Sequence, residues 1–356
     1  MVPGHAGDEP PGWYIEDSGS GMIYKRGRLL GQGTFGRCYR VTEVTTGRVY
    51  ALKVVPRAGL AAVGTGDRVE REQELHRQLS HRHIVRLHRH FTHRGHLCLL
   101  LELCSRGSLA DILRARGRLG EPEVRFYLRQ VISGLRYLHG HGLVHRDLKL
   151  SNFLVTEEMQ VKIGDLGLAR GAAPPGRRWG ALCGTPSHLA PEVLDRRGHG
   201  VPSDIWALGC ALYTALTGRP PFEGSQRLEL YQHIRGARYP LPPQLSPQAR
   251  ALLALMLDPD PAARPSLQDV LDHPFFTQGF TPHRLPPRAC HSVPVFLGRD
   301  PLCRLLRGLQ CCWGGGCAPG TPGGPSPPPP GKQLPRQDPS QANIGGGKPL
   351  LVLGTV

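Results

Sequence analysis

The 356-residue chain contains no apolar run near the roughly 18 residues that a membrane-spanning helix needs, which excludes an integral membrane protein. Its first residues have neither a basic stretch nor an apolar core, so we expect no secretory signal peptide. The ten cysteines are scattered along the chain instead of forming a disulfide framework. Together these absences predict an intracellular protein with reduced thiols.

Acidic residues are outnumbered, with 28 Asp and Glu against 44 Lys and Arg, so the formal net charge is +16. Such a charge is compatible with nucleic acid, an anionic membrane surface or an acidic substrate as partner. Aromatic residues make up only 6% of the chain, and no stacking motif accompanies the basic residues. Nucleic acid is therefore the weaker expectation.

Composition divides the chain into three regions. Residues 1–22 are rich in Gly, Pro and acidic residues and are expected to be flexible. Residues 23–280 show strand-like patterns first and helix-like patterns later, which predicts an α+β fold with a β-rich N-terminal lobe and a helical C-terminal lobe. Residues 281–356 are dominated by Pro and Gly, and we expect a disordered low-complexity tail, because such a segment buries too little apolar surface to offset its ordering entropy.

A glycine-rich hexapeptide has the G-x-G-x-x-G spacing and reads Gly31-Gln32-Gly33-Thr34-Phe35-Gly36. Glycines let a backbone approach phosphate groups closely. A strand-like stretch follows the hexapeptide, where a dinucleotide-binding turn would be followed by a helix. This order favours a hairpin that covers phosphates, although a glycine-rich hairpin without a ligand remains an alternative.

Lys53 lies within an apolar strand-like segment. A lysine there is costly unless it pairs with an acid or binds an anion, and the alternative is an edge lysine whose end reaches solvent. Glu72 on the following helix-like segment is the expected partner, with Glu70 and Glu74 as rivals. A Lys53–Glu72 pair would hold the ammonium group against phosphate oxygens.

The strongest motif is the octapeptide HRDLKLSN at residues 145–152. In such a loop Asp147 accepts the proton of a substrate hydroxyl, Lys149 neutralises a transferred phosphoryl group, and Asn152 binds a metal ion. Asp165 begins a DLG triplet after a strand-like segment, and its carboxylate suits Mg²⁺. The alternative is an ordinary charged loop, which the order of the motifs disfavours.

In this order the motifs resemble those of a eukaryotic protein kinase domain over about residues 23–280, and strings such as KVVPR at 53–57 and LCGTP at 182–186 are similar to the polo-like kinase family. The resemblance implies transfer of the ATP γ-phosphoryl group, with Mg²⁺, to Ser or Thr of protein substrates that are often acidic near the target. It also implies cell-cycle-related signalling in the nucleus, the cytoplasm or both.

The resemblance further implies the residues of the site. The Glu102 carbonyl and the Cys104 amide would hydrogen-bond the adenine. The catalytic residues would be Asp147, Lys149, Lys53 and Glu72, and the metal ligands Asn152 and Asp165. The residues implied for nucleotide binding are Leu30, Gly31, Gln32, Gly33, Thr34, Phe35, Gly36, Arg37, Cys38, Ala51, Lys53, Leu101, Glu102 and Cys104.

Two departures from the family pattern qualify this prediction. The low-complexity tail leaves no room for the two polo boxes that dock partners in the family, so we expect no polo-box docking. Ala181 stands where the family has a phosphorylatable Thr, and no Ser, Thr, Tyr, Asp or Glu lies between Ala169 and Thr185. This predicts weak activity, and the alternative is a pseudokinase-like module that binds nucleotide or a partner without phosphoryl transfer.

Overall fold

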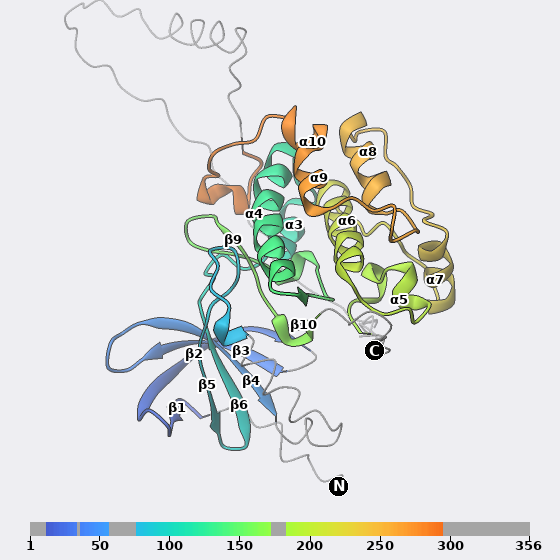
Figure 1. Ribbon diagram of the computed structural model, residues 1–356. Helices are drawn as coiled ribbons and strands as arrows, with labels where there is room; N and C mark the ends of the chain where they lie inside the picture. The colour runs from blue at the N-terminus through green and yellow to red at the C-terminus, as the bar shows by residue number, and fades with distance from the viewer. Residues whose placement is uncertain (1–11, 34–35, 57–75, 172–182, 295–356) are drawn as a thin grey trace, which may run out of the picture. The chain divides into compact units, whose positions relative to one another are not determined.

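The computed structural model describes residues 12–33, 36–56, 76–171 and 183–294 (Figure 1). These ranges all fall within the unit Met1–Phe296. Among the residues singled out from the sequence, Thr34, Phe35, Glu70, Glu72, Glu74 and Ala181 lie outside the described residues, as do residues 1–11 and 295–356 of the expected flexible ends.

A six-stranded antiparallel sheet occupies the N-terminal part of this unit. Its strand order is β1-β2-β3-β4-β6-β5. The strands are β1 (Tyr14–Asp17), β2 (Met22–Gly33), β3 (Gly36–Glu43), β4 (Val49–Pro56), β5 (Leu87–His93) and β6 (His96–Leu101), coloured blue to teal in Figure 1.

One face of this sheet is packed into a hydrophobic cluster. Because successive side chains of a strand point to opposite faces, only alternate residues reach it. The paired residues Tyr39, Leu52 and Leu100 on three neighbouring strands are examples. The buried members are Ile15, Tyr24, Tyr39, Val41, Leu52, Val54, Phe91, Cys98 and Leu100. The other face of β3, β4 and β6 is therefore left for the candidate site.

Helices follow the sheet in the chain, which confirms the predicted α+β division into a sheet region and a helical region. The helices are α3 (Leu109–Arg116), α4 (Glu121–Gly140), α5 (Pro191–Leu194), α6 (Val201–Thr217), α7 (Arg227–Arg235), α8 (Pro247–Met256), α9 (Leu267–Asp272) and α10 (Pro274–Thr277). Helices α4 and α6 lie side by side and are in contact (Figure 1). No helix in the described part of the chain has both the length and the apolar character needed to cross a membrane.

Short strands and most of the 3₁₀ turns lie between α4 and α5 in the chain. Strands β8 (Phe153–Val155) and β9 (Val161–Ile163) form one antiparallel hairpin, and β7 (Leu143–Val144) pairs with β10 (Arg170–Gly171). Four 3₁₀ turns are described: η1 (Leu150–Asn152), η2 (Leu166–Leu168), η3 (Pro186–His188) and η4 (Pro287–Cys290).

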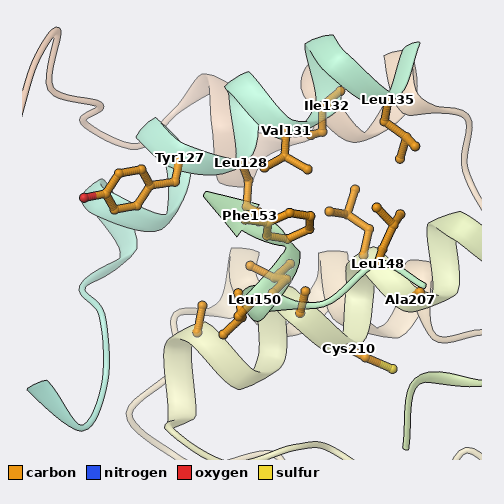
Figure 2. Close-up of a cluster of buried hydrophobic side chains, with 14 of the residues drawn as sticks. Tyr127, Leu128, Val131, Ile132, Leu135, Leu148, Leu150, Phe153, Ala207 and Cys210 are labelled. Carbon is orange, nitrogen blue, oxygen red and sulfur yellow. The ribbon is translucent and has the colours of Figure 1, made fainter. Parts of the chain in front are cut away.

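The segment 145–152 is anchored in the core between α4 and α6. Leu148 is 0% exposed, Leu150 5% and Phe153 0%. Figure 2 shows these three side chains between the apolar residues of α4 and Ala207 and Cys210 of α6. Burying a leucine side chain contributes about 1.5–3 kcal/mol. The polar residues of this segment are therefore held in place by its own leucines.

The packed region extends past residue 280. Leu285, Ala289 and Cys290 are buried members of the helical core. Arg116 of α3 donates a hydrogen bond to the Ala289 carbonyl at 2.9 Å, and Arg125 of α4 donates to the Phe280 carbonyl at 3.0 Å. The expectation of disorder from residue 281 is therefore wrong for residues 281–294, because three buried apolar side chains and an arginine donor from α3 fix a Pro-rich segment that composition alone cannot place.

We predict that Leu285→Ala lowers the free energy of unfolding by about 2–4 kcal/mol, because the substitution leaves a cavity in the core. Leu228→Ala is the matched control, since Leu228 is 65% exposed, and its effect should stay within about 0.5 kcal/mol. Urea denaturation of both variants and the wild type measures the difference. Equal effects of the two substitutions would show that residues 281–294 add nothing to the folded domain.

Candidate active site

Neighbouring strands place predicted nucleotide-binding residues on one face of the sheet. Cys38 pairs with Lys53, and Ala51 pairs with Leu101. Ala51 and Lys53 are two residues apart in β4, so their side chains point to the same face. This face is opposite the hydrophobic cluster, and Cys38, Ala51, Lys53 and Leu101 share it.

The glycines of the G-x-G-x-x-G segment lie at the paired ends of β2 and β3, and this antiparallel pairing confirms the predicted hairpin. Gly31 pairs with Cys38, Gln32 with Arg37, and Gly33 with Gly36. Gly36 has a φ of +149°, and a Cβ atom there would lie 2.1 Å from the Val54 carbonyl oxygen. Glycine is therefore required at this position by close approach of the next strand. Leu30 lies beside the hairpin and is 37% exposed.

Lys53 forms an ion pair with Asp165. The Lys53 Nζ and Asp165 Oδ1 atoms are 2.6 Å apart, and the two side chains are 21% and 37% exposed. The pair joins the open face of the sheet to the turn that follows β9. Glu72, the partner predicted for Lys53, is outside the described residues. The Lys53–Glu72 pair therefore stays a prediction, and Asp165 is the partner that the structure describes.

The β8–β9 hairpin brings Asn152 and Asp165 together from distant positions in the chain. Phe153 pairs with Ile163, so the residues just before β8 and just after β9 meet. The Gly164 amide donates to the Asn152 carbonyl at 2.8 Å, directly before Asp165. Asp165 itself adopts a left-handed backbone conformation with φ of 54°. Such a conformation is uncommon outside glycine and is frequent at functional sites.

Asp147 lies at the centre of a hydrogen-bonded group. Its Oδ1 accepts from the Thr185 amide at 2.9 Å and from the Thr185 hydroxyl at 2.7 Å. Its Oδ2 lies 2.8 Å from the Lys149 Nζ and accepts from Asn152 Nδ2 at 3.3 Å. Lys149 Nζ also donates to the Thr185 hydroxyl at 2.9 Å. Asp147, Lys149, Asn152 and Thr185 are thus assembled by direct contacts.

Both aspartates are ionised at neutral pH. Burial alone would raise the pKa of Asp147, but hydrogen bonds from Lys149 and Thr185 outweigh it and hold that pKa below its usual value. Burial also opposes ionisation of Asp165, and the Lys53 ammonium overcomes this effect and lowers the pKa of Asp165. Asp147 is therefore a proton acceptor, and Asp165 a charged oxygen donor.

A buried carboxylate from α6 holds the backbone before Asp147. Asp204 is 0% exposed; its Oδ2 accepts from the His145 amide at 2.9 Å, and its Oδ1 from the Arg146 amide at 2.9 Å. His139 Nε2 lies 2.9 Å from Asp204 Oδ2. Arg146 has a φ of 69°, a strained value that these hydrogen bonds support.

His145 connects the two aspartates through the backbone. Its ring is 0% exposed; Nδ1 accepts from the Asp147 amide at 3.2 Å, and Nε2 donates to the Gly164 carbonyl at 3.2 Å. Gly164 directly precedes Asp165, so one imidazole fixes the positions of both acidic residues.

Two buried carboxylates support the site from outside it. Asp204 lies beneath residues 145–152 and accepts hydrogen bonds from two of their amides. Glu192 of α5 forms a buried pair with Arg264, whose Nη1 and Nη2 lie 2.7 and 2.8 Å from its carboxylate oxygens. Thr185 was missed as a site residue, although its position in LCGTP was the available signal. Its partners lie 36 and 38 residues away in the chain, which local patterns do not reveal.

The acidic and amide oxygens of this group fit a divalent cation. Asp165 supplies a charged carboxylate, and Asn152 uses its side-chain nitrogen on the Asp147 carbonyl at 2.8 Å, which leaves its oxygen for a metal. Hard oxygen donors of this kind suit Mg²⁺, with phosphate oxygens and water completing the shell.

Residues 24–276 match the family model described as protein kinase domain. The chain belongs to the protein kinase family. Members of this family use ATP and divalent metal ions and act on proteins. The match ends short of residues 281–294, which pack against the kinase domain and are described above.

Similar curated proteins place this kinase domain among the polo-like kinases, as its motifs predict. The inactive serine/threonine-protein kinase PLK5 of Mus musculus is 54% identical over 294 residues, which are 83% of this chain and 49% of that protein. The serine/threonine-protein kinase PLK2 of Mus musculus is 50% identical over 282 residues, 79% of this chain and 41% of that protein. The serine/threonine-protein kinase PLK1 of Xenopus laevis is 45% identical over 271 residues, 76% of this chain and 45% of that protein. The chain thus spans about half the length of these relatives, or less.

We predict that Asp204→Asn lowers the free energy of unfolding at pH 7 by about 2–3 kcal/mol, because the amide cannot accept hydrogen bonds at both of its ends. Burial opposes ionisation of Asp204, but the contact with His139 and the amide of His145 hold the pKa of Asp204 below its usual value. The stabilisation is therefore fully present above pH ~4 and is lost as the pH falls through the lower native pKa.

The difference between wild type and Asp204→Asn should accordingly shrink as the pH is lowered below 4, which denaturation curves at a series of pH values measure. Asp272→Asn is the matched control, because Asp272 is exposed and accepts hydrogen bonds from Gln268. A constant difference at all pH values would contradict the assigned role of the Asp204 charge.

Proposed function

We propose that this chain is an ATP-dependent serine/threonine protein kinase of polo-like type. The observation that carries the proposal is the ionised Asp147 carboxylate held 2.8 Å from the Lys149 ammonium and hydrogen-bonded to Thr185. A second charged pair, Lys53 with Asp165, is connected to it through His145 and the β8–β9 hairpin. This arrangement provides a proton acceptor, a metal-binding carboxylate and two ammonium groups for phosphate oxygens.

Each residue has a distinct role in the proposed reaction. Asp147 orients the substrate hydroxyl and accepts its proton, and Thr185 holds the carboxylate that does so. Lys149 neutralises negative charge on the phosphoryl group in transit, and Lys53 holds phosphate oxygens of ATP. Asn152 and Asp165 hold Mg²⁺, which when bound neutralises phosphate charge. The glycine-rich ends of β2 and β3 cover the phosphates, and residues 102–104 bind the adenine.

Proteins with acidic residues near the target Ser or Thr are the proposed substrates. The net charge of +16 supports this choice, because a basic domain attracts acidic segments at long range. Recognition through polo boxes is not part of the proposal, and cell-cycle-related signalling in the nucleus or cytoplasm is the proposed setting.

Transfer of labelled γ-phosphate from Mg-ATP to an acidic Ser/Thr peptide tests this function. We predict that the wild-type chain transfers phosphate and that Asp147→Asn reduces the rate at least about 100-fold, since general base catalysis contributes about 10²–10⁴-fold. Nucleotide binding by Asp147→Asn should remain, because Asp147 contacts Lys149, Thr185 and Asn152 and is not a predicted nucleotide ligand. Equal rates for the two proteins would contradict the proposal.

A chain that binds Mg-ATP without transferring phosphate would instead establish the nucleotide-binding module considered above. One of its relatives is named an inactive kinase, and this name is compatible with the second function. Measuring nucleotide binding beside phosphate transfer separates the two functions.

We predict that Thr185→Ala lowers kcat about 10-fold or more, because a hydrogen bond to a charged carboxylate contributes about 1.5–3 kcal/mol. Thr185→Ser keeps the hydroxyl group and with it this hydrogen bond, so its kcat should stay within about 3-fold of wild type. Steady-state kinetics of both variants with the same peptide provide the comparison. A serine variant as slow as the alanine variant would assign the effect to packing of the methyl group and not to the hydrogen bond.

A further inference from the structure

The side chain of Glu102 is held from two directions. Its Oε1 lies 2.9 Å from Lys162 Nζ in β9. Its Oε2 accepts from the Arg86 amide at 3.3 Å, while the Glu102 amide donates to the Arg86 carbonyl at 2.9 Å. Glu102 directly follows β6, at the start of the segment proposed to bind adenine.

Lys162 lies in β9, the strand that directly precedes the proposed metal ligand Asp165. It lies three residues before Asp165 in the chain. Its neighbours Val161 and Ile163 are both 0% exposed and point into the core, so the alternation of the strand directs Lys162 to the other side. One short strand therefore contacts the adenine-binding segment and positions the partner of Lys53.

The burial of Lys162 indicates a dedicated contact. Its side chain is only 14% exposed, and lysines are seldom buried to this extent unless they are paired. Among the ion pairs described in the structure, Glu102 is its partner. The Glu102 side chain is 29% exposed, so the pair keeps some contact with solvent. The pair links Glu102 to β9, the strand that precedes Asp165, and this link indicates a positional role for the contact.

A closed ring of contacts surrounds this ion pair. Strand β9 is bound to the segment before β5 by the Ile163 amide, which donates to the His83 carbonyl at 2.8 Å, and by the Val85 amide, which donates to the Ile163 carbonyl at 2.9 Å. The next residue, Arg86, binds the backbone and side chain of Glu102. Lys162 closes the ring from β9 back to Glu102, so removing it frees one side of the Glu102 carboxylate and leaves the backbone contacts in place.

We propose that Lys162 is a positioning residue for nucleotide binding. It fixes Glu102, so that residues 102–104 can bind the adenine while Asp165 lies at the phosphates of the same nucleotide. This inference rests on the proposed kinase function. Lys162 acts through Glu102 and takes no part in proton or phosphoryl transfer. Its loss should therefore weaken nucleotide binding and leave the chemical step unchanged.

The test measures the dissociation constant of Mg-ADP and the KM for ATP and kcat of the full chain. Lys162→Met should raise the dissociation constant and KM about 3- to 10-fold and change kcat less than about 2-fold, as expected when ground-state and transition-state binding are lost together. Glu102→Gln should have a similar effect, and Lys162→Arg should recover most of the affinity because it keeps the charge.

Arg235→Met is the matched control. Arg235 Nε lies 2.9 Å from Asp195 Oδ1 in the helical region, and these side chains are 45% and 34% exposed. Breaking this pair should leave nucleotide affinity at the wild-type value. Thermal unfolding of all variants shows whether any loss of affinity follows from loss of folded protein.

Wild-type affinity in Lys162→Met would overturn this inference alone, as would a loss of affinity that parallels a loss of thermal stability or that Lys162→Arg fails to recover. Absence of Mg-ADP binding by the wild-type chain would overturn the proposed function and this inference with it. The two failures are therefore distinguishable in the same set of measurements.

Discussion

The candidate site depends on one buried carboxylate. Asp204 accepts hydrogen bonds from the consecutive amides of His145 and Arg146, which places Arg146 in a left-handed conformation that an isolated chain would rarely adopt. That turn directs Asp147 toward Lys149 and Thr185, and it sets the His145 ring against the Gly164 carbonyl. Burying a charged carboxylate is costly unless its oxygens accept hydrogen bonds. The Asp204 carboxylate accepts them from two backbone amides and from the His139 imidazole. The geometry of both aspartates in the site therefore derives from a residue that contacts neither of their carboxylates in the described structure.

In two segments of the chain, alternate residues pack into the hydrophobic core and form the polar site. In residues 145–152, Leu148 and Leu150 enter the core between α4 and α6, while Asp147, Lys149 and Asn152 form the site. The same division holds in the sheet, where Leu52 packs into the cluster and its neighbours Ala51 and Lys53 face the site. Because core and site share a backbone, packing of the core also fixes the backbone from which the site side chains extend. This coupling explains how a strongly basic chain keeps its acidic residues in fixed, ionised positions.

Local patterns predicted most of the fold but only part of the site. The order of strands and helices and the hairpin of β2 and β3 follow from spacing along the chain or from family resemblance, and the structure places them accordingly. Thr185 and the Lys162–Glu102 pair were not found, because their contacts join residues that lie far apart in sequence. Residues 281–294 were assigned to the tail, since Pro-rich composition does not show that Arg116 and Arg125 bind the carbonyls of this segment and of Phe280. What sequence misses here is tertiary pairing, which propensity and periodicity do not encode.

Residues 183–192 are fixed to the rest of the site by contacts that involve no phosphate group. Gly184 has a φ of +105°, and a Cβ atom there would lie 2.6 Å from the Arg146 carbonyl oxygen, so the backbone passes directly over residues 145–152. Cys183 Sγ lies 3.6 Å from His199 Nε2, and burial lowers the pKa of His199 to about 4, so this imidazole is neutral at physiological pH. Thr185 then binds Asp147, and the pair of Glu192 with Arg264 anchors the helix that follows. A phosphate on this segment orders it by adding charge for basic residues to bind. In residues 183–192, packing, the hydrogen bonds of Thr185 and the Glu192–Arg264 ion pair already provide such order, and the contacts that hold Asp147 involve no phosphate group.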